Sequence, residues 1–279
     1  MIRFFIIALA MLAAIGPSRA AERLDVVASF SIIGDFVRNV GGNSVSVTTL
    51  VGPDSDAHVY APTPADAKKI AGARLIFVNG LGFEGWLPRL VQSSGSRAKI
   101  VTASDGISPL RLGSAADPHA WQSVGNAKVY VANISRALAA ADPDGAEQFR
   151  KNAQAYVETL DALDREVRDA VARIPPDRRK VISTHNAFGY FAAGYGIEFI
   201  APLGVSTESE PSARDIARII TQIRTAGIPA VFLENITDPR LIGRISAETG
   251  ARIGGTLYSD SLTGEKGDSP TYIAMVRHN

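Results

Sequence analysis

Three of the four histidines in this 279-residue chain lie in loop-like sequences that follow strand-like or extended runs. His58 lies in Asp-Ala-His-Val-Tyr, His119 in Asp-Pro-His-Ala-Trp and His185 in Ser-Thr-His-Asn-Ala. Imidazole is a common protein ligand for zinc. Histidine is scarce in this chain, and packing alone would not place it three times in equivalent settings. The three residues are therefore candidate metal ligands. The fourth histidine, His278, is the penultimate residue and has no comparable setting.

A carboxylate could complete this set. Asp260 follows a strand-like run at 252–258, much as His185 ends the run at 180–184. Ligands of open α/β sheets bind beyond the carboxyl ends of the strands. Three neutral imidazoles and one carboxylate suit tetrahedral Zn²⁺, whereas Mn²⁺ would recruit more oxygen ligands. The residues alone leave a second role open, because Asp260 could instead cap a loop with Ser259 or Ser261.

Other polar and aromatic residues near the strand ends have simpler interpretations. Four acidic residues are expected to form turns, to hydrogen-bond an imidazole from behind or to lie on the surface: Asp117, Glu208, Glu210 and Glu234. Trp121 and the cluster Phe188, Tyr190 and Phe191 are expected to pack beside the site and keep it dry. The chain has no cysteine and no Gly-x-Ser-x-Gly motif, so neither a thiol nor that serine motif can supply a nucleophile.

Strand and helix signals alternate through the first half of the chain. Short apolar runs predict strands at 24–30, 45–51, 74–78 and 99–103, and helical patterns lie between them at 32–40, from 63 onward and at 84–91. Thr63-Pro64 is a helix start, with Thr63 as the N-cap and Pro64 at the first helical position. This alternation predicts a mostly parallel sheet covered by helices.

Two helices are predicted in the middle of the chain. The first spans 124–141, and the second has apolar residues at alternating steps of four and three between Phe149 and Ala170. The second helix would run for roughly 30 residues, or about 45 Å, from Asp142-Pro143 to Pro175-Pro176. We interpret it as a rigid spacer between two lobes. A helix lying across one large domain remains the alternative.

The second half repeats the alternation, with strands predicted at 180–184, 198–201, 230–233 and 252–258 and helices at 212–226 and 239–249. The predicted fold class is therefore α/β, with two lobes that are each a mostly parallel sheet flanked by helices, joined by one long rigid linker helix. The predicted divisions are an N-terminal lobe at 21–142, the linker helix at 143–174 and a C-terminal lobe at 175–279.

Residues 1–20 have the pattern of a secretory signal peptide. Arg3 precedes an apolar stretch, and Ser18-Arg19-Ala20 forms a small-x-small cleavage site. The absence of cysteine excludes a lipid-attachment cysteine, so we expect a free protein in a bacterial periplasm. Without this segment the chain has 27 basic and 28 acidic side chains and no basic stripe, so we expect no nucleic-acid partner.

Several motifs together resemble the cluster A-I substrate-binding proteins of zinc and manganese ABC importers, the ZnuA-like family. They occur in the family's order along nearly the whole mature chain: Asp-x-His-x-Tyr-x-Pro-x-Pro-x-Asp at 56–66, Asn-Gly-Leu-Gly-Phe-Glu-x-Trp at 79–86, Asp-Pro-His-x-Trp at 117–121, Thr-His-Asn-Ala-Phe-Gly-Tyr at 184–190, Glu-Pro-Ser at 210–212 and Phe-Leu-Glu at 232–234. The resemblance implies one metal ion between two lobes. It places the family's ligand positions on His58, His119, His185 and Asp260.

Two details of the resemblance favour zinc. Manganese members tend to have glutamate at the third ligand position, where this chain has His185. Many zinc members have a histidine-rich loop before the second ligand, but residues 103–116 contain no histidine. This absence and the run Gly-Gly-Thr-Leu-Tyr-Ser-Asp at 254–260 resemble the AztC-type branch, which is linked to a periplasmic zinc metallochaperone.

We therefore expect a monomeric, non-enzymatic periplasmic protein that binds one Zn²⁺ per chain and delivers it to an ABC permease of the inner membrane. A metallochaperone is a further expected partner. Two alternatives remain. A manganese-binding relative would differ in metal preference, and a zinc metallohydrolase would need an open coordination position and a base such as Glu208 or Glu210.

Overall fold

The first lobe is built on a four-stranded parallel sheet. The structure is a computed structural model that describes residues 23–228 and 230–279, so the predicted signal peptide lies outside the described residues. The strands are β1 (Leu24–Phe30), β2 (Val45–Val51), β3 (Leu75–Val78) and β4 (Lys99–Thr102), in the order β2-β1-β3-β4. All three pairings are parallel, so the carboxyl ends of the strands lie at one edge of the sheet.

Helices cover this sheet, and their buried side chains pack with those of the strands to form the core of the lobe. They are α1 (Ser31–Gly41), α2 (Pro64–Gly72), α3 (Leu87–Ser94) and α4 (Val124–Ala141). The predicted start of α2 is confirmed, because the Thr63 hydroxyl accepts a hydrogen bond from the Asp66 backbone N–H and the Asp66 side chain accepts one from the Thr63 backbone. A short hairpin of β5 (Arg111–Leu112) and β6 (Ala115–Ala116) precedes α4.

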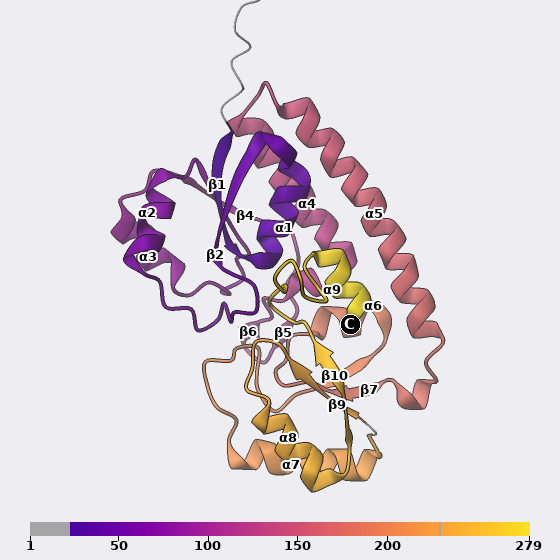
Figure 1. Ribbon diagram of the computed structural model, residues 1–279. Coiled ribbons are helices and arrows are strands. Elements are labelled where there is room, and N and C mark those ends of the chain that lie inside the picture. Colours follow the sequence, from indigo (N-terminus) through magenta and orange to yellow (C-terminus); the bar gives the residue numbers. More distant parts are fainter. Residues whose placement is uncertain (1–22, 229) are drawn as a thin grey trace, which may run out of the picture.

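The second lobe repeats the architecture. Its strands are β7 (Lys180–Ile182), β8 (Glu198–Ile200), β9 (Ala230–Glu234) and β10 (Arg252–Leu257), in the parallel order β10-β9-β7-β8. Its helices are α6 (Gly189–Tyr195), α7 (Ala213–Ala226) and α8 (Arg240–Thr249). The predicted fold class, two parallel-sheet lobes with a long helix between them, is confirmed (Figure 1).

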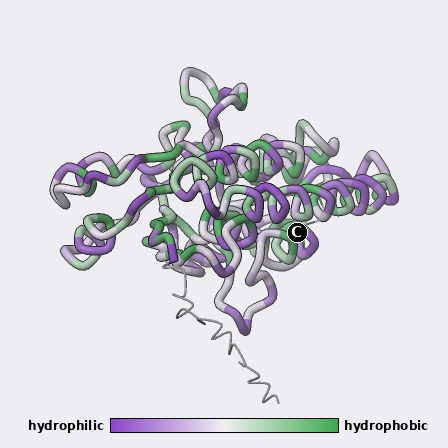
Figure 2. Tube along the Cα trace, turned by 90° about the horizontal axis from the view of Figure 1, so that it is seen from above, coloured by the Kyte–Doolittle hydropathy of each residue, from purple (hydrophilic) through white to green (hydrophobic). Residues whose placement is uncertain are grey.

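The long helix α5 (Ala146–Ala172) has 27 residues and contains neither glycine nor proline. Its apolar stripe, which includes Phe149, Tyr156, Leu160 and Leu163, is buried in the same core as α1 and α4. Figure 2 shows hydrophobic and hydrophilic residues on different sides of the turns along the long helical segments. In Figure 1 the helix extends beside the first lobe and continues toward the second.

The end of the chain ties the two lobes together a second time. After β10 the chain returns to the first lobe, where α9 (Tyr272–His278) packs against α1 and α5. Leu262, Tyr272 and Met275 are part of the first lobe's hydrophobic core. The division into lobes at 142 and 175 remains our proposal, and these last residues are shared between the lobes.

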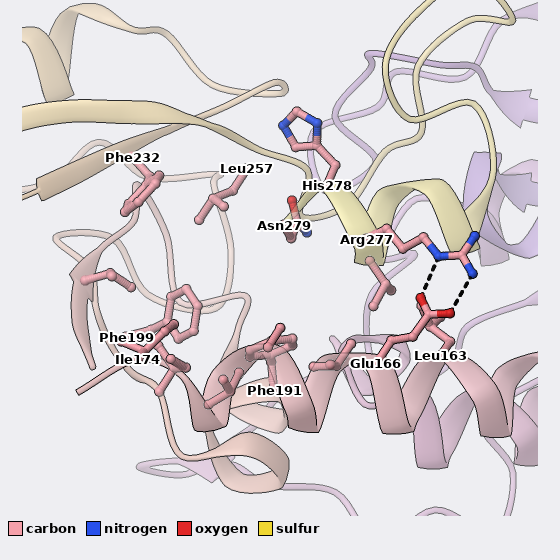
Figure 3. A pocket seen from close by; sticks show the side chains of 16 residues that line it. Leu163, Glu166, Ile174, Phe191, Phe199, Phe232, Leu257, Arg277, His278 and Asn279 are labelled. Atoms are coloured by element: carbon pink, nitrogen blue, oxygen red, sulfur yellow. Dashed lines mark hydrogen bonds and ion pairs between the residues drawn. The ribbon is translucent and has the colours of Figure 1, made fainter. Parts of the chain in front are cut away.

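An apolar pocket of about 430 Å³ lies between α5 and the second sheet. Phe191, Phe199, Phe232 and Leu257 line it, and Arg277 forms an ion pair with Glu166 at its edge (Figure 3). No described helix is long and apolar enough to cross a bilayer.

Candidate metal centre

The four predicted ligands come from loops at the facing ends of the two lobes. His58 lies in the loop after β2, and His119 lies in the turn before α4. His185 and Asp260 follow β7 and β10 in the second lobe by three residues each. One ligand atom from each of the four residues lies within 4.8 Å of those from the other three, and all four residues are buried. The fold therefore brings the predicted set together.

The ligand atoms are close enough to share one ion. The Nε2 atom of His119 lies 3.3 Å from Nε2 of His58 and 3.3 Å from Nε2 of His185. The Asp260 carboxylate lies 3.2 Å from His58 Nε2, 3.1 Å from His185 Nε2 and 3.5 Å from His119 Nε2. Tetrahedral coordination with bonds of about 2.0–2.1 Å requires ligand atoms roughly 3.3 Å apart, which matches these separations.

Two of the imidazoles are oriented from behind by carboxylates. Asp117 Oδ1 lies 2.8 Å from His119 Nδ1, and Glu234 Oε2 lies 2.5 Å from His185 Nδ1. A carboxylate can only accept, so each Nδ1 carries the proton and, in the neutral ring, Nε2 presents its lone pair. Two such lone pairs 3.3 Å apart repel each other unless a cation or a proton lies between them. A carboxylate that accepts from the ring nitrogen facing away from the ion is typical of metal-binding histidines.

Glu234 holds more of the second lobe than the His185 ring alone. Its Oε1 atom accepts hydrogen bonds from the backbone N–H groups of Thr184 and His185, at 2.7 and 2.9 Å. Its Oε2 atom also accepts one from the Ser259 hydroxyl, 2.8 Å away. Because Ser259 precedes Asp260, this single buried carboxylate at the end of β9 positions both ligands of the second lobe.

His58 is held differently. Its ring lies edge-on against Phe83, with the ring centroids 4.6 Å apart. Its backbone N–H donates to Asp56 Oδ1, 2.8 Å away, but its Nδ1 atom makes no hydrogen bond to any residue in the described ranges. Asp56 Oδ2 in turn accepts a hydrogen bond from Thr207 of the second lobe, at 2.6 Å.

The Asp260 carboxylate has no ordinary hydrogen-bond partner. Within the described part of the chain, the polar atoms that approach its oxygens are the Nε2 atoms of the three imidazoles, and the side chain is completely buried. A buried carboxylate without a donor is costly unless a cation compensates for it. The backbone carbonyl of Ser259, by contrast, accepts from Trp121 Nε1 and Gln122 Nε2, so first-lobe side chains hold the loop in place. The alternative role of Asp260 as a loop cap is therefore not observed.

Charge coupling in the metal-free centre favours protonated imidazoles. Burial lowers the pKa of His185, but the carboxylates of Glu234 and Asp260 outweigh it and raise the pKa well above its usual value. Burial likewise opposes the charge on His119, while Asp260 and Asp117 raise its pKa. The pKa of Asp260 is well below its usual value, because the charges of His119 and His185 outweigh the effect of burial. Protons therefore compete with a metal for this site.

The other residues considered in the sequence analysis differ in their positions relative to the centre. Asp117 and Glu234 lie behind imidazoles, whereas Glu208 and Glu210 are exposed. The Trp121 ring packs 5.2 Å from that of His119. His278 lies apart from the four ligands and hydrogen-bonds the Thr256 carbonyl. Sequence reasoning did not single out Thr207, and it gave neither Asp56 nor Ser259 the role seen here, because these roles depend on contacts between distant segments.

The comparisons with known proteins agree with this architecture and site. The sequence profile described as ZnuA, zinc-uptake complex component A, periplasmic, matches residues 26–279. The chain therefore belongs to this family, the cluster A-I metal-binding proteins of ABC importers. As a member, it is a periplasmic, non-enzymatic metal-binding protein, and the family implies an ABC permease as its partner.

Individual relatives are named for different metals. The iron-binding protein YfeA of Yersinia pestis is 38% identical over 97% of this chain and 88% of its own length. The manganese-binding lipoprotein MntA of Halalkalibacterium halodurans is 35% identical over 99% of this chain and 94% of its own length. These names do not fix the metal of this chain.

Solved structures give the same result. The periplasmic zinc-binding protein TroA of Treponema pallidum superposes with a TM-score of 0.89 at 31% identity, covering 92% of this chain and 96% of TroA. The Mn-bound periplasmic metal-binding protein of Candidatus Liberibacter asiaticus has a TM-score of 0.83 at 33% identity, covering 92% of this chain and 96% of its own. The buried site of three histidines and one aspartate is thus a metal site of a family that binds several metals.

Proposed function

We propose that this protein captures one Zn²⁺ per chain through His58, His119, His185 and Asp260 and delivers it to an ABC permease. The observation that carries the proposal is the donor set. Three imidazole nitrogens and one carboxylate converge at separations that suit a small tetrahedral ion. Mn²⁺ favours more oxygen ligands than the single carboxylate supplied here.

The short segment before the second ligand supports the AztC-type branch as the finer assignment. Residues 103–116 include the small β5–β6 hairpin and contain no histidine, so they offer no auxiliary imidazoles for collecting zinc. We propose that a periplasmic zinc metallochaperone supplies the ion instead. Adding such a protein loaded with zinc to the metal-free chain should transfer the ion faster than passive release from the donor.

Manganese or iron is the second candidate cargo, since a Mn-bound structure and an iron-binding relative are both similar to this chain. The metallohydrolase alternative has no support in the geometry. The two residues considered as its base, Glu208 and Glu210, are exposed, whereas all four ligands are buried.

A metal titration tests the proposed cargo. Metal-free protein should bind one equivalent of Zn²⁺, and excess Mn²⁺ or Fe²⁺ should not displace it. His58→Ala, His119→Ala and His185→Ala should each weaken zinc binding by more than the roughly 10–100-fold typical of losing an outer-shell partner.

His278→Ala is the matched control for these variants and should bind zinc as the unaltered protein does. Equal losses from His278→Ala and His58→Ala would contradict the site. Displacement of zinc by excess Mn²⁺ or Fe²⁺ would contradict the choice of metal while leaving the site intact.

A further inference from the structure

One ligand of the centre lies nearest to solvent. His58 is 7% exposed, whereas His119, His185 and Asp260 are each 0% exposed. The next residue along the chain, Val59, is 52% exposed. The side of the centre that carries His58 is therefore its least enclosed side.

His58 is also the ligand whose ring has the fewest hydrogen bonds on the side away from the centre. The other two imidazoles are clamped through Nδ1 by Asp117 and Glu234. The Nδ1 atom of His58 has no such partner among the described residues, and its ring is located by Phe83 and by the course of its own backbone. The position of His58 therefore depends on what fixes the loop at 52–58.

Several hydrogen bonds hold that loop against the rest of the molecule. The Ser261 hydroxyl accepts from the Ser55 backbone N–H, the Leu262 carbonyl accepts from the Asp54 N–H, and two carboxylates of the loop accept from second-lobe side chains. Near its start, Asp54 has a left-handed backbone with φ of 53°, and its side chain accepts from Asn235 at 3.0 Å in an exposed contact. Two residues further on, the Asp56 carboxylate accepts from Thr207 at 2.6 Å with one oxygen and from the His58 backbone N–H with the other. Among these contacts of the described residues, the one at Asp56 connects the second lobe to a proposed ligand through a single side chain.

We infer that the hydrogen bond from Thr207 to Asp56 is a latch across the cleft, and that its opening sets the rate at which the bound metal leaves. Thr207 is a positioning residue in the loop between β8 and α7, and it acts on the ion through Asp56 and His58. The inference rests on the proposed metal-binding function. A hydrogen bond to a charged group contributes more than one between neutral groups, and differences in affinity between related complexes lie mostly in the dissociation rate.

Release kinetics test the latch. Zinc-loaded protein is mixed with excess EDTA, and the rate of metal loss is measured for the unaltered chain, Thr207→Val and Thr207→Ser. Thr207→Val keeps the side-chain shape but removes the hydroxyl, so it should release zinc about tenfold faster. Thr207→Ser restores the hydroxyl and should restore slow release. The metal-free melting temperature of each variant checks that it is folded under the conditions of the measurement.

A matched control and a double variant complete the design. Thr221→Val removes an exposed hydroxyl that donates to the Ala217 carbonyl within α7, and it should leave release unchanged. Because the latch acts through Asp56, Thr207→Val should add nothing to the faster release of Asp56→Ala. The His58 backbone amide should exchange hydrogen faster in zinc-loaded Thr207→Val than in the unaltered protein.

Each outcome is decisive. Unaltered release from Thr207→Val, failure of Thr207→Ser to restore slow release, or independent effects of the two substitutions would overturn the latch. If His58→Ala also leaves zinc binding intact, the proposed metal site itself fails. If His58→Ala weakens binding but Thr207→Val releases zinc normally, only the latch is wrong.

Discussion

At the scale of single residues, the centre is asymmetric. His119 and His185 are each backed by a carboxylate, and Glu234 also holds the loop of Asp260 through Ser259. His58 has no carboxylate behind its ring among the described residues. Outer-shell carboxylates fix both the orientation and the basicity of an imidazole ligand. Three of the four ligands are therefore preorganised on the deeper side, and the fourth closes the site from the loop.

Replacement of Asp260 tests how much the carboxylate contributes. Asp260→Ala should still bind Zn²⁺, because three imidazoles remain and water can take the fourth position. We expect a loss of affinity of at least tenfold and faster release, measured by competition with a chelator. The loop itself should survive, since Trp121 and Gln122 hold the Ser259 carbonyl. Complete loss of binding together with a lower melting temperature of the metal-free variant would instead show a structural role.

The pH dependence of binding follows from the raised pKa values of His119 and His185 in the metal-free centre. The protonated ring cannot coordinate, so zinc affinity should be full above these raised pKa values and should fall as the pH drops through them. Calorimetry in buffers of different ionisation enthalpy should show protons released on binding at pH 7, where an unperturbed histidine with a pKa of about 6.5 is already mostly neutral. In Asp260→Asn, which lacks the charge that raises both pKa values, fewer protons should be released. No proton release from either protein would contradict this account.

The grouping of the four proposed ligands could be predicted from the sequence because the setting of each is local. Each of His58, His119 and His185 lies in a short motif of its own, and Asp260 follows a strand, so the common edge of a parallel sheet brings them together. The contact behind His119 is also local, because Asp117 is two residues away, but the other contacts behind the ligands join distant segments. Asp56 and Thr207 are 151 residues apart, and His185 and Glu234 are 49 apart. No periodicity or spacing reports such a pairing, so Thr207 could not be recognised before the fold was known.

At the scale of elements, a helix or strand could be predicted when it was long enough, or apolar enough, to give a clear sequence pattern. The helix at 124–141 and the strands of both sheets have strong periodicity or buried apolar runs, and they form within a few residues of the expected limits. Helix α6 and helix α9 have seven residues each and were not predicted. Elements this short have too little periodic signal, and α9 forms because Tyr272 and Met275 are buried against the first lobe.

The start of α2 links an element to the site, because it ends the loop that carries His58. Asp66 accepts hydrogen bonds from the Tyr60 hydroxyl, the Thr63 backbone and hydroxyl, and Lys69. Burial opposes the charge on Asp66, but these hydrogen bonds outweigh it and hold its pKa well below the usual value. A carboxylate with a lowered folded-state pKa stabilises the fold at pH values above its unfolded pKa of about 3.9, and this contribution is lost as the pH falls toward the folded pKa.

Asp66→Asn should therefore lower the free energy of unfolding by about 1–2 kcal/mol at pH 7, as for the loss of a helix cap. The difference from the unaltered protein should shrink as the pH falls below about 4. Urea unfolding of the metal-free protein at pH 7 and pH 3 measures both values. Asp169→Asn, at an exposed position on α5, is the control and should change stability little at either pH. An undiminished difference at pH 3 would show that the hydrogen bonds, not the charge, supply the stability.

At the scale of the whole molecule, two connections restrain the lobes. Helix α5 runs between them without a glycine or proline, which are the usual causes of a sharp kink. The chain then returns from Asp260 to the first lobe, where Leu262 and Tyr272 are part of its core. A hinge closure would have to bend a continuous helix and also pull buried side chains out of a packed core. Local movement of the loops at 52–58 and 205–211 requires neither.

We therefore expect metal to be gated by these loops while the lobes keep their separation. The chain has no cysteine, so Lys68→Cys on α2 and Arg244→Cys on α8 provide a clean pair of exposed label sites, one on each lobe. The distance between these labels should change little when zinc is added. A single label at Val59→Cys, beside His58, should be mobile without zinc and restrained with it, whereas a label at Thr221→Cys on α7 should not respond. A large change in the Lys68–Arg244 distance on zinc binding, with no change at Val59, would show instead that the lobes close as rigid bodies despite α5 and the returning chain.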